Sequence, residues 1–180
     1  MTGRGVFRQL RSLILPFTVV VVIPFLQVGR LRPFGLRLHL PIPLLQVSLG
    51  ALVFCGGFLL LVITIRLFVR KGEGTLAPWN PPQKLVTEGI YRFVRNPMIL
   101  GVLFMLIGET VFFGSWSLLI WTLIFGVANT LYFQFSEEPR LAKRFGKDYL
   151  DYRRNVPMWI PRLKSWVRGT ASASKHDKPA

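Results

Sequence analysis

The apolar residues of this chain fall in four long blocks, and this patterning constrains the fold more than any other feature of the sequence. The blocks cover residues 13–28, 44–69, 98–114 and 115–135. A helix rises about 1.5 Å per residue, so blocks of this length suit the roughly 30 Å hydrocarbon core of a bilayer. Charged residues make up only 17% of the chain, against about 25% in typical soluble domains. We therefore predict an all-α integral membrane bundle of about four transmembrane helices.

Helix breakers and polar runs divide the rest of the sequence. Prolines and basic residues fill the loops between the first three blocks, and Gly114-Ser115 gives a tight hairpin between the last two. Residues 136–154 mix charges with a four-residue apolar stripe, which predicts a C-terminal cytoplasmic amphipathic helix at the membrane interface, with Gly146 as a point of interruption. We predict a single membrane domain over residues 1–167 and a disordered tail over residues 168–180.

The basic residues orient the predicted helices. Of the 23 Lys and Arg residues, 20 lie in the N-terminus, in the second loop with its flanks, or after Phe135. Four helices place these three regions on one side of the membrane, and the positive-inside rule makes that side the cytoplasm. We therefore expect a multi-pass protein of the cell membrane, a bacterial inner membrane, with both termini cytoplasmic.

Charge and cysteine content exclude other classes of protein. The net charge is +15, but the basic residues flank apolar blocks, which favours contact with anionic membrane lipids over nucleic-acid binding. The chain has one cysteine, Cys55, and two histidines that are far apart in sequence. We expect no metal site, because no group of Cys and His residues has ligand spacing.

Two polar clusters are predicted to meet on the cytoplasmic side. The first covers residues 83–97 and the second is Glu137-Glu138, each at the cytoplasmic end of one arm of the hairpin. Backbone amides at the start of a helix near Met98, with Arg92 and Arg95, suit an anionic group, and the glutamates suit hydroxyl or ammonium groups. These residues also fit a plain topology signal followed by an amphipathic helix, so the pattern alone leaves function open.

The order of motifs in the C-terminal half is more specific. The sequence runs Lys84-Leu85-Val86-Thr87-Glu88-Gly89-Ile90-Tyr91-Arg92-Phe93-Val94-Arg95-Asn96-Pro97-Met98, then Glu137-Glu138, then Phe145-Gly146-Lys147-Asp148-Tyr149-Leu150-Asp151-Tyr152, then Val156-Pro157 and Ile160-Pro161. Over about residues 74–162 this resembles the isoprenylcysteine carboxyl methyltransferase-like family of membrane methyltransferases. The N-terminal half matches only as hydrophobic helices.

The resemblance implies a methyltransferase that uses S-adenosylmethionine in a cytoplasm-facing pocket and takes a lipophilic acceptor from the bilayer. It implies catalytic roles for Arg95 and Glu138. It also implies cofactor binding by residues of both clusters: Gln83, Lys84, Leu85, Val86, Gly89, Tyr91, Asn96, Pro97, Met98, Ile99 and Glu137.

Three positions depart from the family pattern. Asn96 stands where the family has histidine, Ile99 where tyrosine is frequent, and Phe133 where the prenylcysteine branch has an arginine for the substrate carboxylate. Thiol, amine and carboxylate acceptors therefore all stay open. Two other functions stay open as well: an NADPH-dependent membrane reductase and a non-catalytic membrane protein on the same scaffold.

Overall fold

The computed structural model describes residues 16–30, 43–71 and 85–166, and the regular elements in these ranges are helical. The predicted all-α class is thus confirmed for the described part of the chain, while Gln83, Lys84 and the tail over residues 168–180 lie outside it. In chain order the elements are η1 (Thr18–Val22), α2 (Ile23–Arg30), α3 (Pro43–Lys71), η2 (Gly89–Arg92), α4 (Pro97–Phe113), α5 (Trp116–Tyr132), η3 (Phe133–Glu137), α6 (Glu138–Phe145) and α7 (Lys147–Asn155).

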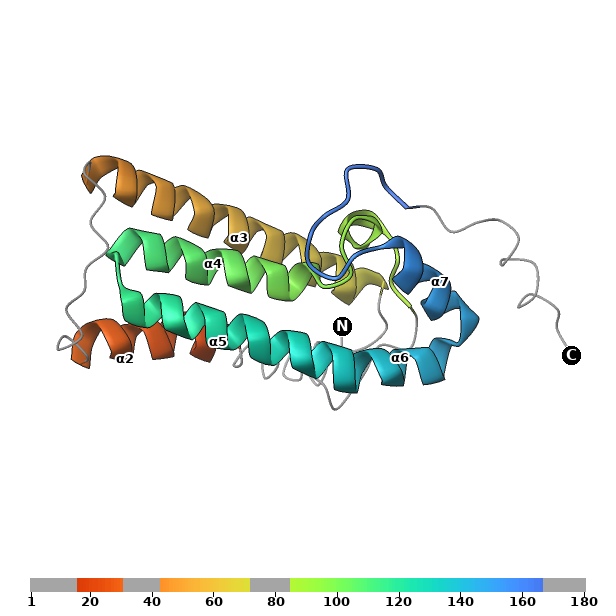
Figure 1. The fold of residues 1–180 in the computed structure, drawn as a ribbon. Coiled ribbons are helices and arrows are strands. Elements are labelled where there is room, and N and C mark those ends of the chain that lie inside the picture. The colour runs from red at the N-terminus through yellow and green to blue at the C-terminus, as the bar shows by residue number, and fades with distance from the viewer. Residues whose placement is uncertain (1–15, 31–42, 72–84, 167–180) are drawn as a thin grey trace, which may run out of the picture.

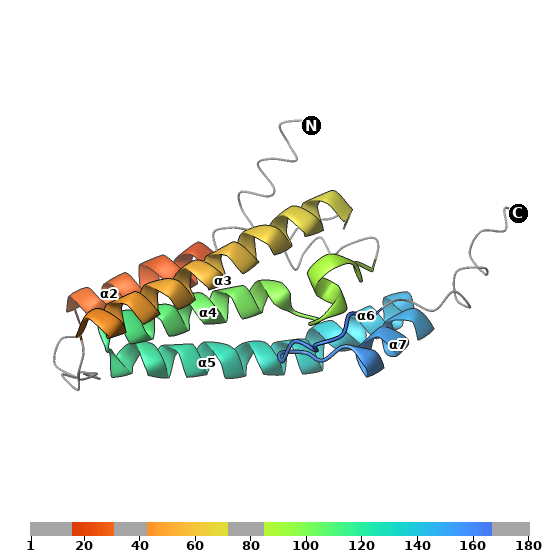
Figure 2. The same ribbon diagram turned by 90° about the horizontal axis from the view of Figure 1, so that it is seen from above.

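Three long helices form the body of the molecule. α4 lies between α3 and α5, and α2 runs along α5 (Figures 1 and 2). The hairpin between α4 and α5 turns at Gly114, as the sequence predicts, with a left-handed φ of 57°. At the opposite end, η2, α6 and α7 gather beside the first turn of α4 (Figure 1). We call this the polar end of the bundle.

Two described helices are long and apolar enough to cross a membrane. They are Pro43–Leu67 and the continuous helix Trp116–Phe145, while Thr18–Val28 and Pro97–Phe113 are shorter apolar helices. Large side chains on the outside of the bundle are exposed, for example Leu44, Leu52 and Phe135. An apolar surface of this kind is unfavourable in water and favourable in lipid.

The contact between α3 and α4 depends on glycines that let the two backbones touch. A Cβ atom added to Gly57 would lie 2.7 Å from the Gly101 carbonyl oxygen. One added to Gly108 would lie 2.6 Å from the Phe54 backbone nitrogen. Gly56, beside Gly57, would meet nothing within 4 Å. Glycines on the facing sides of α3 and α4 therefore set the distance between these helices.

A proline explains the irregular first helix. In the π-helix η1 the Ile23 amide donates to the Thr18 carbonyl, five residues back. The same register would pair the Val19 carbonyl with residue 24, but Pro24 has no amide hydrogen. Nε1 of Trp121, on α5, donates to this carbonyl at 3.3 Å. An indole from a neighbouring helix thus replaces the missing backbone donor.

The residues of the predicted interfacial helix, 136–154, form two helices that meet at Gly146, the point of interruption expected from the sequence. α5 passes without a break through η3 into α6, which ends at Gly146, where φ is 56° and ψ is −131°. Residues other than glycine rarely adopt this backbone conformation. Because Gly146 does, α7 begins there in a new direction. The predicted apolar stripe still forms one cluster, because Leu141 and Phe145 of α6 pack against buried Tyr149 of α7.

Candidate functional site

Residues 85–97 lead the chain into α4 at the polar end. Gly89 has a φ of 58° and begins η2, so this glycine makes a tight turn. Val94 is buried against the bundle and Pro97 is buried at the first position of α4, where a missing amide hydrogen costs nothing. The segment is therefore fixed where it enters the helix.

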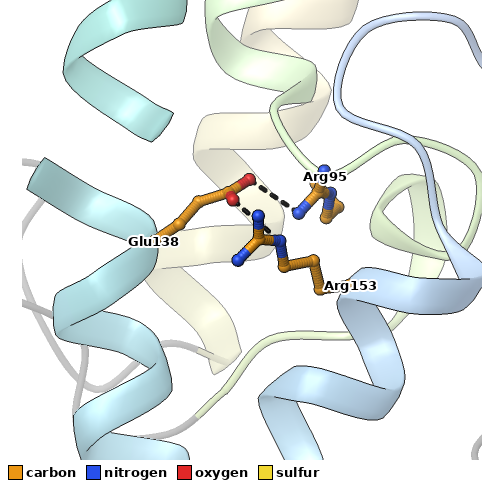
Figure 3. A network of polar contacts seen from close by, with 3 residues as sticks. All are labelled: Arg95, Glu138 and Arg153. Atoms are coloured by element: carbon orange, nitrogen blue, oxygen red, sulfur yellow. Dashed lines mark hydrogen bonds and ion pairs between the residues drawn. The ribbon is translucent and has the colours of Figure 1, made fainter. Parts of the chain in front are cut away.

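An ion-pair network joins this segment to α6 and α7. Nη1 of Arg95 lies 2.6 Å from Oε1 of Glu138, and Nε of Arg153 lies 3.0 Å from Oε2 of the same carboxylate (Figure 3). The Glu138 side chain is 4% exposed, that of Arg95 12% and that of Arg153 46%. A buried carboxylate needs such partners, and here each of its oxygens faces a guanidinium group.

The chain after α7 returns across residues 92–95. We call residues 156–166 the C-terminal strap. The Arg95 amide donates to the Pro157 carbonyl at 2.9 Å, and the Arg162 amide donates to the Phe93 carbonyl at 3.0 Å. The Trp166 amide donates to the Arg92 carbonyl at 3.1 Å. These bonds hold residues 92–95 between the bundle and the strap.

Two buried tyrosines of α7, Tyr149 and Tyr152, contact the segment that leads into α4. The Tyr152 hydroxyl donates to the Tyr91 carbonyl at 2.7 Å, and the Tyr149 and Tyr152 side chains are both 3% exposed. Burial raises the pKa of Tyr149 to about 12, an effect that the Glu138 charge increases and the Arg95 charge opposes. Burial also raises the pKa of Tyr91 and of Tyr152. All three hydroxyls therefore stay protonated near neutral pH.

The first turn of α4 presents polar groups that the described residues leave unused. Asn96 occupies the N-cap position, and its side chain makes no capping hydrogen bond. The amides of Met98 and Ile99 have no acceptor within the helix, because the first turn lacks preceding carbonyls. Nε of Arg95 is buried without a partner in the described ranges. Together these donors can bind an anionic group at the positive end of the α4 dipole.

The neighbouring glutamates differ sharply in environment. Glu138 is buried in the ion-pair network, whereas Glu137 is only half-buried and its Oε2 lies 3.4 Å from the Tyr132 hydroxyl. A carboxylate held this loosely can accept hydrogen bonds from a ligand. Of the pair, Glu137 is therefore the better candidate for a binding residue.

The structure brings together part of the predicted site. Arg95 and Glu138 are in contact, and Gly89, Tyr91, Asn96, Pro97, Met98 and Ile99 lie on one continuous stretch beside them. The side chains of Leu85 and Met98 pack inward, Leu85 against the Tyr149 cluster and Met98 against the bundle core. Val86 is half-buried in the same segment. Gln83 and Lys84 lie outside the described residues.

Sequence reasoning missed Arg153, Tyr149, Tyr152 and the strap as parts of this region. Arg153 stood within a basic run and carried no signal of its own. The two tyrosines were visible as aromatic residues, but their direction depends on the turn at Gly146. Pro157 and Pro161 indicated the end of a helix and belong to the family resemblance, but neither was assigned to the site. In the described residues no group of three or more His, Cys, Asp or Glu side chains could hold a metal ion.

Comparison with known proteins gives consistent matches. The sequence profile of the phospholipid methyltransferase family matches residues 45–148, more than half of the chain. A region of 85 residues is 39% identical to methanethiol S-methyltransferase 2 of Bradyrhizobium diazoefficiens. A region of the same length is 34% identical to protein-S-isoprenylcysteine O-methyltransferase of Schizosaccharomyces pombe. Over 162 residues the chain is 29% identical to methanethiol S-methyltransferase of Pseudomonas deceptionensis.

The matches cover different shares of each protein. They include 45%, 46% and 84% of this chain, in the order given. The chain spans 30%, 35% and 58% of the length of those three relatives. Of the polar end, η2, the first turn of α4, α6 and the start of α7 fall inside the region that the family profile matches.

Proposed function

This chain belongs to the phospholipid methyltransferase family, and from that premise we propose that it is an integral membrane methyltransferase dependent on S-adenosylmethionine. The family match agrees with the resemblance found in the sequence. One observation carries the proposal on the structural side. The ion pair of Arg95 and Glu138 joins two polar clusters that are 43 positions apart at one end of an apolar bundle.

The residues at this end fit the methyl donor. Its amino-acid portion carries a carboxylate, which suits Asn96, the amides of Met98 and Ile99, and the positive end of α4. The half-buried carboxylate of Glu137 suits an ammonium group or a ribose hydroxyl. Gly89 lets a ligand approach the backbone, and Val86 and Tyr91 belong to the same segment. When bound, S-adenosylmethionine supplies an electrophilic methyl group on a sulfonium, with no change of oxidation state in the protein.

The proposed role of Arg95 and Glu138 follows from their pairing. Each Glu138 oxygen already accepts from a guanidinium, so this carboxylate is a weak candidate for removing a proton from an acceptor. The pair instead holds residues 92–97 against α6, which fixes the position of Asn96 and the first turn of α4. Alignment of this kind is the main contribution an enzyme makes to transfer between bound reactants.

We place the site on the cytoplasmic side of a bilayer that four helices cross. Support comes from the two long apolar helices, the two shorter ones and the exposed apolar surface of the bundle. The distribution of 20 of 23 basic residues gives the orientation, with both termini in the cytoplasm. The acceptor then reaches the polar end from within the membrane.

The acceptor we propose is lipophilic. The relatives' names specify a thiol, methanethiol, and a prenylated cysteine, and an apolar bundle surface suits molecules that partition into lipid. Asn96 has no titration near neutral pH, so a nucleophile that is already anionic needs no base from this position. The reductase alternative loses support, because the family and all three relatives are described as methyltransferases.

A transfer assay tests this function directly. The protein in lipid nanodiscs is mixed with S-adenosylmethionine that carries a labelled methyl group and with alkyl thiol, amine and carboxylate acceptors of equal chain length. We expect label in the organic phase with at least one acceptor. An Asn96→Leu variant should lose transfer, and Asn129→Leu, a change within α5, should retain it. Label absent with all three acceptors, from protein that binds the donor, would contradict methyl transfer to these lipophilic classes.

A further inference from the structure

The C-terminal strap combines a fixed backbone with unusually exposed aliphatic side chains. Its backbone is held at Pro157, Arg162 and Trp166 by hydrogen bonds to residues 92–95. Between these points the side chain of Ile160 is 79% exposed and that of Leu163 is 100% exposed. A segment held this way cannot turn these side chains inward by a simple rotation, so both are presented away from the protein.

The two aromatic side chains of the strap, Trp159 and Trp166, contact the protein instead, and Trp166 packs against Tyr152. The Trp159 ring lies 6.3 Å from the Phe133 ring on η3, with the two planes at 90°. An edge-to-face contact of this kind fixes the strap against the continuous helix. The side of the strap that carries Ile160 and Leu163 is thus distinct from the side that packs on the protein.

Basic residues lie close in sequence to the two exposed aliphatic residues. Arg162 and Lys164 flank Leu163 in sequence, and Arg154 stands at the end of the neighbouring helix α7, next to Arg153, whose guanidinium is paired with Glu138. Apolar side chains set among cations are the composition that binds the interface of an anionic membrane. A soluble acidic partner would satisfy the charges but would leave no reason for aliphatic tips between them.

The position of the strap along the bundle also suits contact with a membrane surface. In both views it turns back from α7 and reaches the level at which α4 begins (Figures 1 and 2). If the apolar helices cross a bilayer, the first turn of α4 marks the boundary between hydrocarbon and headgroups. The strap then runs along this boundary, whereas the corner between α6 and α7 lies farther from the bundle (Figure 1).

We propose that the C-terminal strap is a membrane anchor that inserts Ile160 and Leu163 among the headgroups of an anionic leaflet. The partner is the lipid surface, which takes the aliphatic tips in its acyl boundary and the cations at its phosphates. This inference rests on the membrane orientation given under Proposed function and is independent of the methyl-transfer chemistry. Because the strap is bonded to residues 92–95, its docking holds that segment at the interface.

Depth measurements on labelled cysteines test the anchor. In a Cys55→Ser background, Leu163→Cys, Ile160→Cys and Lys147→Cys each carry an environment-sensitive fluorophore, and the protein is placed in vesicles of zwitterionic lipid with or without about 30% anionic lipid. Lys147 is exposed at the start of α7 and serves as the matched control. Quenching by lipids with a nitroxide near the headgroup reports insertion, and quenching by acrylamide reports exposure to water.

The expected result is quenching by headgroup nitroxide at positions 160 and 163 that exceeds quenching at position 147 by about threefold and rises with anionic lipid. A Lys164→Gln change should weaken the dependence on anionic lipid. Equal acrylamide quenching at positions 163 and 147 in both lipids would overturn the proposal. Protection at position 163 that grows with protein density and is indifferent to nitroxide lipid would also overturn it, because a second copy would then cover the strap.

Discussion

Arg95 and Glu138 are 43 positions apart in sequence, and their side chains meet at 2.6 Å with only 12% and 4% of their surfaces exposed. One residue precedes the first turn of α4 and the other begins α6. The contact ties the start of one arm of the helical hairpin to the end of the other. The proposed binding region therefore depends on this contact.

Removal of the Glu138 charge should destabilise the folded protein by breaking its contact with Arg95. Glu138→Gln leaves the buried Arg95 guanidinium without its counter-charge, and we expect a loss of about 3 kcal/mol of stability, measured by chemical denaturation in detergent micelles. Glu137→Gln is the matched control, because the contact of Glu137 with the Tyr132 hydroxyl is long, at 3.4 Å. Equal stability of the two variants would show that the ion pair contributes little.

The glycine contact between α3 and α4 gives a second test. Gly57→Ala places a Cβ 2.7 Å from the Gly101 carbonyl oxygen and should cost about 2 kcal/mol, since backbone atoms on α4 must move. Gly56→Ala, one position earlier, meets nothing within 4 Å and should be neutral or slightly stabilising. In detergent, Gly57→Ala should therefore have a lower melting temperature than Gly56→Ala. The reverse order would contradict the prediction.

The indole of Trp121 should stabilise the first helix. Trp121→Phe removes the donor to the Val19 carbonyl that Pro24 leaves unpaired, with an expected cost of about 1 kcal/mol. Trp116→Phe, at an exposed position of the same helix, is the control. In a Trp121→Phe, Pro24→Ala double variant the cost should shrink, because residue 24 then has an amide hydrogen. Additive costs would contradict this account of η1.

Alkaline pH should destabilise the polar end through Tyr149. Burial, followed by the Glu138 charge, raises the pKa of this hydroxyl to about 12 in the folded protein, against about 10 in an unfolded chain. The folded protein therefore keeps a proton that the unfolded chain releases, and the stabilisation present below about pH 10 is lost as the pH rises toward 12. Tyr149→Phe should flatten the fall in melting temperature between about pH 10 and pH 12. Tyr132→Phe, an exposed tyrosine, should leave its slope unchanged.

The sequence was sufficient for the helices and insufficient for the directions between them. The length of an apolar block largely decides where a helix runs, so the predicted spans 44–69, 98–114 and 115–135 coincide closely with α3, α4 and α5 with η3. The continuation of α5 into α6 was missed, because polar residues at position 136 and beyond suggested a change of element. The structure shows that the helix continues through these polar residues into α6.

The candidate site was predictable where it follows the chain and hidden where it depends on tertiary structure. Residues 85–99 form one stretch, so their neighbourhood could be seen in advance. The pairing of Glu138 with Arg153 depends on the reversal at Gly146, whose angle no local pattern specifies. The prolines of the strap were visible as part of the family resemblance, but its contacts were not. Its hydrogen bonds join residues about 60 to 75 positions apart, a separation at which only the fold decides contact.

Calorimetric binding of S-adenosylmethionine to the protein in lipid nanodiscs tests the central claim most directly, with NADPH and a Glu137→Ala variant measured in parallel. The account predicts saturable binding of S-adenosylmethionine, a loss of at least about tenfold in affinity in Glu137→Ala, and no binding of NADPH. Binding of NADPH without S-adenosylmethionine, or of neither ligand by folded protein, would contradict it.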